Sequence, residues 1–122
     1  MDHKAFIDAN RERFLDELMQ WLRIPSVSSD PNSKEAMAQA AEYLKNRFIE
    51  QGVDKVEIYP TEGHPIVYAE KITDPSKPTV LVYGHYDVQP PDPLDLWDSP
   101  PFEPVIKKTE EHPEGAIYAR GS

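Results

Sequence analysis

The sequence predicts an α/β protein, a layered α/β/α domain with a mixed, largely parallel sheet, and three features predict it. Two amphipathic helical stretches come first, and three short stretches rich in β-branched residues follow. The third, residues 79–83, is apolar without polar alternation, which is typical of a central strand covered on both faces. Gly84, His85 and Asp87 come directly after it, at the end of the strand where open parallel sheets bind ligands.

Composition limits the classes of function. The 122 residues suit one domain with one modest core rather than a two-domain enzyme. The formal charge is −9, from 22 acidic and 13 basic residues, so nucleic acid and anionic membranes are poor partners. The chain has no cysteine, which excludes disulfides and thiolate metal sites. Because residues 1–4 begin no signal peptide and no apolar run approaches a membrane span of about 18 residues, we expect a cytoplasmic protein.

The first helix is predicted over residues 2–23. Asp2 is a plausible N-cap, and Pro25 ends the helix because its ring disfavours helical geometry at Ile24. Trp21 is interpreted as a packing residue rather than a ligand-binding one. The predicted core face consists of apolar residues at helical spacing: Ile7, Phe14, Leu15, Leu18, Trp21 and Leu22.

A serine-rich loop, residues 26–32, separates this helix from a second one that starts after Ser33 and ends near Gln51. The loop has no Gly-x-Ser-x-Gly turn, so its serines are interpreted as turn and capping residues rather than nucleophiles. Gly52 suits the left-handed position that follows a helix. The buried stripe is predicted to be Met37, Ala40, Ala41, Leu44 and Phe48.

Two strands are predicted next, at residues 53–59 and 66–71. The first alternates apolar and charged residues, as a half-exposed edge strand does. His64 lies in the turn between them, where we expect it to face solvent and to bind no metal. Residues 73–78 form a loop that leads into the apolar run 79–83.

A long loop, residues 88–104, follows the histidine. Its proline density excludes regular structure, and Trp97 and Phe102 are predicted to anchor it. We expect a hairpin of strands 105–106 and 116–119, with His112 exposed at its tip. The loop acids are interpreted as solvated residues rather than metal ligands: Asp92, Asp95, Asp98 and Glu103.

His85 and Asp87 are the candidate site residues. In an extended segment alternate side chains share a side, so both point one way while Tyr86 points back into the fold. That arrangement suits a metal-binding imidazole whose second nitrogen is held by a carboxylate. The alternative is a hydrogen-bonded histidine at a strand end with no ligand role.

Three stretches of this sequence form a recognisable set. Two of them are Ile-Pro-Ser-Val-Ser at 24–28 and Tyr-x-Arg-Gly-Ser at 118–122. The third carries the candidate site residues and runs from Val82 through Gly84, His85, Asp87 and Pro90 to Trp97, Pro101, Phe102 and Pro104. Together they resemble the zinc exopeptidase family of aminoacylases, succinyl-diaminopimelate desuccinylases and carnosinase-type dipeptidases, and they are most similar to the carnosinase-type dipeptidases.

The resemblance implies a zinc metallopeptidase that hydrolyses dipeptides or N-acyl amino acids through a metal-bridging water. Residues 1–122 correspond to the N-terminal part of its catalytic domain, without the lid or dimerisation domain and the C-terminal part. His85 then binds one of two zinc ions, for which cobalt or manganese is a possible substitute, and Asp87 orients it. The general base and the remaining ligands fall outside this stretch, so we expect the 122-residue chain alone to be inactive.

Two other possibilities stay open at this point. The chain is then either a complete, non-catalytic α/β binding or oligomerisation domain derived from such a peptidase, or a truncation product that is stable only as a homo-oligomer. A serine, cysteine or phosphate-binding enzyme is disfavoured, because the sequence has no nucleophile motif and no phosphate-cradling glycine loop.

Overall fold

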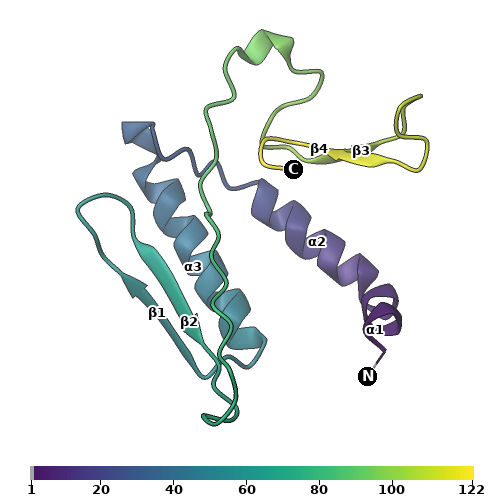
Figure 1. The fold of residues 1–122 in the computed structure, drawn as a ribbon. Coiled ribbons are helices and arrows are strands. Elements are labelled where there is room, and N and C mark those ends of the chain that lie inside the picture. The colour runs from purple at the N-terminus through teal and green to yellow at the C-terminus, as the bar shows by residue number, and fades with distance from the viewer. Residues whose placement is uncertain (1) are drawn as a thin grey trace. The chain divides into compact units, whose positions relative to one another are not determined.

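The computed structural model describes residues 2–122, which form two compact units (Figure 1). The central unit is Pro25–Pro90, and the terminal unit combines the residues up to Ile24 with Pro91–Ser122. No helix in the described part of the chain has the length and apolar character needed to cross a membrane.

The central unit is built on helix α3 (Lys34–Glu50), which packs against the hairpin of strands β1 (Lys55–Tyr59) and β2 (Ile66–Glu70), as Figure 1 shows. The short 3-10 turn η1 (Pro31–Ser33) precedes α3, and the Asp30 carboxylate accepts a hydrogen bond from Asn32 N in that turn.

Helix α3 confirms the second predicted helix. Met37, Ala40 and Ala41 are buried, and the small side chains of the two alanines let the helix lie close to its neighbours. Gly52 follows the helix at φ +70°, the left-handed conformation expected for it. The stripe is less complete than predicted at its C-terminal end: Leu44 is only half-buried and Phe48 is 36% exposed.

The β1–β2 hairpin is antiparallel, with Val56 opposite Ala69 and Ile58 opposite Val67. These four residues are half-buried, whereas the charged residues between them on β1 are exposed. The half-exposed strand predicted from this alternation is therefore confirmed.

The predicted central strand at residues 79–83 is not formed. Val80, Leu81, Val82 and Tyr83 are 82%, 88%, 86% and 90% exposed, and none of them pairs with a strand within residues 2–122. An apolar run becomes a covered strand only when neighbouring strands and helices enclose it, and the described residues provide none. The α/β class is confirmed, while the sheets within residues 2–122 are antiparallel pairs.

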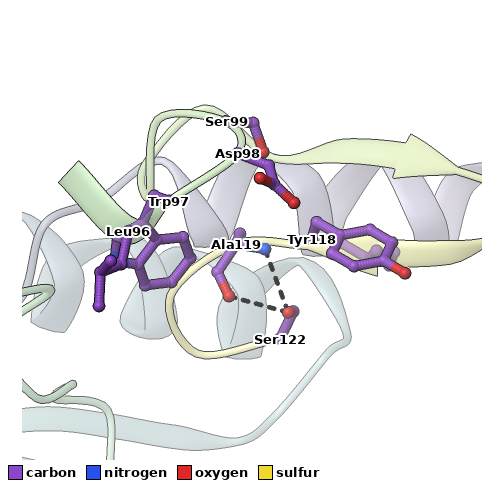
Figure 2. Close-up of a pocket in the computed structure, with 8 residues that line it drawn as sticks. Leu96, Trp97, Asp98, Ser99, Tyr118, Ala119 and Ser122 are labelled. Carbon is purple, nitrogen blue, oxygen red and sulfur yellow. Dashed lines mark hydrogen bonds between the residues drawn. The ribbon is translucent and has the colours of Figure 1, made fainter. Parts of the chain in front are cut away.

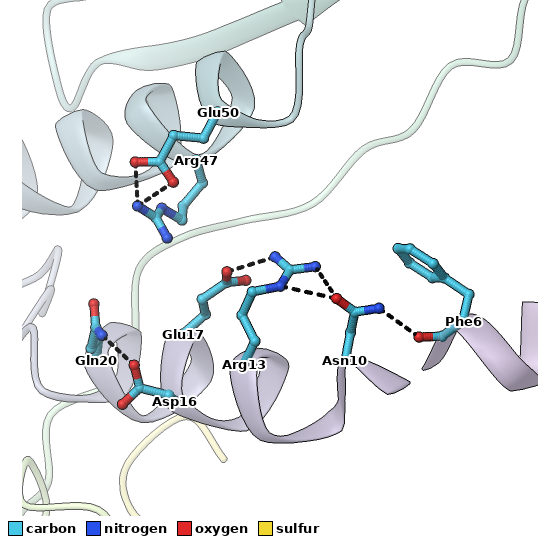
Figure 3. A network of polar contacts seen from close by, with 8 residues as sticks. All are labelled: Phe6, Asn10, Arg13, Asp16, Glu17, Gln20, Arg47 and Glu50. Atoms are coloured by element: carbon cyan, nitrogen blue, oxygen red, sulfur yellow. Dashed lines mark hydrogen bonds and ion pairs between the residues drawn. The ribbon is translucent and has the colours of Figure 1, made fainter. Parts of the chain in front are cut away.

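In the terminal unit the single predicted helix 2–23 is two helices, α1 (His3–Ala9) and α2 (Arg11–Leu22). Asp2 caps α1 as predicted, because its side chain accepts from Lys4 N at 3.0 Å. Asn10 interrupts the helix: its Nδ2 donates to Phe6 O at 2.8 Å, and its backbone leaves helical geometry (Figure 3).

The core face predicted for this region is confirmed in part: Phe14 and Leu15 are half-buried. Leu22 is the only buried residue of α1 and α2, while Ile7 and Leu18 are 54% and 40% exposed. Trp21 is half-buried. The exposed side of α2 carries helical polar pairs, such as Arg13 Nη1 to Glu17 Oε1 at 2.8 Å (Figure 3).

The C-terminal half of this unit contains the 3-10 turn η2 (Leu94–Leu96) and the antiparallel strands β3 (Val105–Lys107) and β4 (Ala116–Tyr118). Trp97 anchors the loop as predicted. Its Nε1 donates to Pro91 O at 2.7 Å, and the Arg120 guanidinium lies 5.0 Å from its ring centre. His112 is exposed, also as predicted.

Candidate metal centre

The candidate site is organised by two segments of the central unit that lie side by side, residues 26–28 and 86–88. Ser26 Oγ donates to Tyr86 O at 2.9 Å, and Val88 N donates to Ser26 O at 2.9 Å. Val27 and Val88 form an isolated parallel bridge. Ser26 and Val27 are 3% and 5% exposed, so the segment that holds the histidine loop is itself well packed.

His85 and Asp87 point toward one another, as their spacing predicts. His85 Nδ1 is 3.0 Å from Asp87 Oδ1 and 3.0 Å from Asp87 O. A carboxylate and a carbonyl only accept hydrogen bonds, so Nδ1 carries the proton. With the proton on Nδ1, the lone pair that can bind a metal lies on Nε2, on a side chain that is 77% exposed.

Asp87 is held from its other oxygen as well. Ser28 Oγ donates to Asp87 Oδ2 at 2.5 Å. This hydrogen bond is the main reason why the pKa of Asp87 lies below its ordinary value; the His85 ring acts in the same direction, and partial burial opposes both. The carboxylate is therefore ionised at neutral pH and supplies negative charge behind the imidazole.

Tyr86 and His64 make hydrogen bonds next to the His85–Asp87 pair. Tyr86 points back into the unit, where its hydroxyl donates to Pro65 O at 2.5 Å and burial raises its pKa. The prediction that His64 faces solvent is wrong. His64 is half-buried, and its Nε2 is 2.8 Å from Ser28 O. Sequence reasoning missed the roles of Ser28 and His64, although Ser28 lies in one of the stretches that carry the family resemblance.

The residues present fit one part of a metal site. His85 offers an imidazole nitrogen whose tautomer and orientation are set by a carboxylate, the usual support of a metal-bound histidine. A catalytic zinc takes three protein ligands, and within residues 2–122 no three His, Cys, Asp or Glu side chains gather to hold a metal ion.

A shallow pocket in the terminal unit offers no alternative site. It is lined by Leu96, Trp97, Tyr118 and neighbouring residues, and Asp98 is its one carboxylate (Figure 2). Within it, Ser122 Oγ donates to Ala119 O at 2.9 Å and accepts from Ala119 N at 3.2 Å (Figure 2).

Comparison with known proteins confirms the resemblance seen in the sequence, although no protein-family model matches the chain. The Cys-Gly metallodipeptidase DUG1 of Saccharomyces cerevisiae is 32% identical over 127 residues, covering 94% of this chain and 26% of that enzyme. The Beta-Ala-His dipeptidase of Mus musculus is 33% identical over 131 residues, covering 96% of this chain and 25% of that enzyme.

A solved structure agrees with the sequence comparison. The di-peptidase Dug1p from Saccharomyces cerevisiae matches with a TM-score of 0.81 and 32% identity, covering 94% of this chain and 26% of that one. The chain thus resembles metallodipeptidases along nearly its whole length and spans about a quarter of the length of the curated relatives it matches.

Proposed function

We propose that residues 1–122 are the N-terminal part of the catalytic domain of a zinc-dependent dipeptidase, and that His85 binds one of its zinc ions. The observation that carries the proposal is the His85–Asp87 pair at 3.0 Å, with Nε2 free to bind a metal. The similarity to two metallodipeptidases over more than nine-tenths of the chain supports it.

In this proposal each residue has a defined task. His85 presents Nε2 as a neutral ligand, and Asp87 keeps the proton on Nδ1 and raises the basicity of the ring. Bound zinc supplies a nucleophilic water and stabilises the charge that develops on the scissile carbonyl oxygen. The general base and the other ligands come from residues outside 1–122, so the isolated chain is inactive.

The substrates proposed are dipeptides or N-acyl amino acids, as the names of the Cys-Gly and Beta-Ala-His relatives suggest. The charge of −9 supports a small-molecule substrate rather than nucleic acid or an anionic membrane as the partner. We also propose a cytoplasmic location, and a homo-oligomer is compatible with this assignment.

Activity of the whole protein containing this chain tests the proposal. Cys-Gly and β-Ala-His are offered as substrates with zinc, cobalt or manganese. We expect His85→Ala to lower kcat/KM by more than about 100-fold, since loss of an outer partner alone costs 10–100-fold. His112→Ala, an exposed histidine in the terminal unit, is the matched control and should change nothing. Undiminished turnover by His85→Ala would refute the proposal.

A second candidate is a non-catalytic α/β binding or oligomerisation domain. The exposed apolar run of Val80 to Tyr83 favours it, because such a run is a template for pairing with another chain. Light scattering of the 122-residue chain tests this candidate: a monomer at all concentrations argues against oligomerisation through this segment.

A further inference from the structure

Three side chains, those of Ser28, Asp87 and His85, are joined by hydrogen bonds into a relay that ends at the imidazole of His85. Ser28 Oγ donates to Asp87 Oδ2 at 2.5 Å, and Asp87 Oδ1 accepts from His85 Nδ1 at 3.0 Å. Ser28 lies 59 residues before Asp87 in the chain, so the first bond is a tertiary contact rather than a feature of the loop itself.

We propose that Ser28 is a positioning residue for His85: its hydroxyl fixes the carboxylate plane of Asp87, and that carboxylate, together with the Asp87 carbonyl, fixes the tautomer and direction of the imidazole. The inference rests on the proposed function of His85 as a metal ligand. It assigns Ser28 no contact with the metal or the substrate.

The need for such a residue follows from exposure. The His85 side chain is 77% exposed, so packing does not hold its ring, and the Asp87 side chain is 37% exposed, so water competes for its oxygens. The last torsion of an aspartate side chain is broad, so a hydrogen bond to the second oxygen narrows the range of carboxylate orientations. With Ser28 on Oδ2, Oδ1 stays directed at Nδ1.

Ser28 is itself held in place. Its carbonyl oxygen is 2.8 Å from His64 Nε2, and its two predecessors, Ser26 and Val27, are buried. Ser26 also ties this segment to the histidine loop through Tyr86 O. The hydroxyl of Ser28 is thus fixed before any ligand binds, which is what a positioning residue requires. Ser29 is exposed and lies outside the relay, so it provides a matched control.

The tautomer of the His85 imidazole is a direct measure of the proposed role of Ser28. Long-range ¹H–¹⁵N correlation spectra of the whole, metal-free protein give the tautomer of each histidine, and His85→Ala assigns the signal. In the wild type we expect His85 to carry its proton on Nδ1. In Ser28→Ala the Asp87 carbonyl still accepts from Nδ1 but the carboxylate has lost its second hydrogen bond, so we expect a larger share of the Nε2 tautomer than in the wild type and faster exchange of the ring proton. Ser29→Ala should leave the signal unchanged, and Ser28→Thr, which keeps the hydroxyl, should restore it.

A pure Nδ1 tautomer in Ser28→Ala would contradict the inference, and so would identical spectra for Ser28→Ala and Ser29→Ala. Should Ser28→Ala fail to fold, Ser28→Cys replaces it, because a thiol is a weak donor of similar size. We expect Ser28→Cys to lie between the wild type and a mixture.

Metal affinity gives a second readout and separates the two proposals. In titrations with Zn²⁺ we expect Ser28→Ala to bind about tenfold more weakly than Ser29→Ala, the low end of the range for partners behind a metal-bound histidine. If the wild type bound no Zn²⁺, the proposed function would fail while the tautomer result still decided the role of Ser28. Equal affinities of the two variants would overturn the inference alone.

Discussion

Two adjacent segments of the central unit differ sharply although their sequences are continuous. Residues 79–83 have the strongest strand pattern in the chain, yet Val80 to Tyr83 are more than 80% exposed. Residues 86–88 are half-buried and hydrogen-bonded to residues 26–28. Residues 86–88 are therefore held by a few specific hydrogen bonds to residues 26–28. Residues 79–83 would need neighbouring strands or helices to cover them, and residues 2–122 supply none.

The largest expected effect comes from placing a charge in residues 26–28, which hold residues 86–88, and an equivalent charge in residues 79–83. In the 122-residue chain, Val27→Asp puts a carboxylate at a position that is 5% exposed and should lower the free energy of unfolding by about 3–5 kcal/mol. Val82→Asp, at 86% exposure, should change it by less than about 0.5 kcal/mol. Urea unfolding curves measure both.

The same pair sharpens the comparison in the whole protein. If further chain covers residues 79–83, Val82→Asp should there cost at least about 2 kcal/mol, the value of burying a valine side chain. An effect as small as in the 122-residue chain would show that the segment stays uncovered.

A smaller effect is expected from removing one of the contacts that hold the histidine loop. Ser26→Ala deletes the donor to Tyr86 O and should lower the free energy of unfolding by about 1 kcal/mol. Ser29→Ala, three residues on and exposed, should be neutral. Equal stabilities of the two variants, measured by urea unfolding, would mean that the hydroxyl of Ser26 contributes nothing to the loop.

The sequence predictions were most accurate where the interactions join residues that are close together in the sequence. The pairing of His85 with Asp87 was predictable because alternation along an extended segment is local, and Asp2 and Gly52 mark helix ends by local geometry. The break at Asn10 was missed because apolar spacing does not show that its amide hydrogen-bonds to Phe6 O.

The support of the site was not predictable. Ser28 reaches Asp87 across 59 residues, and His64 reaches Ser28 across 36, so neither contact leaves a periodic signal. The loop serines were interpreted as turn residues from composition alone. The apolar pattern of residues 79–83 indicates a strand that must be covered on both faces. Only the structure shows that the described residues leave this segment exposed.

The metal content of the whole protein tests the central claim, that His85 is a metal ligand, most directly. After exhaustive dialysis, elemental analysis should find about two zinc ions per chain in the wild type, as a paired catalytic site requires. His85→Ala should retain one or none, and His112→Ala should match the wild type. Equal zinc content in His85→Ala and the wild type would contradict the account.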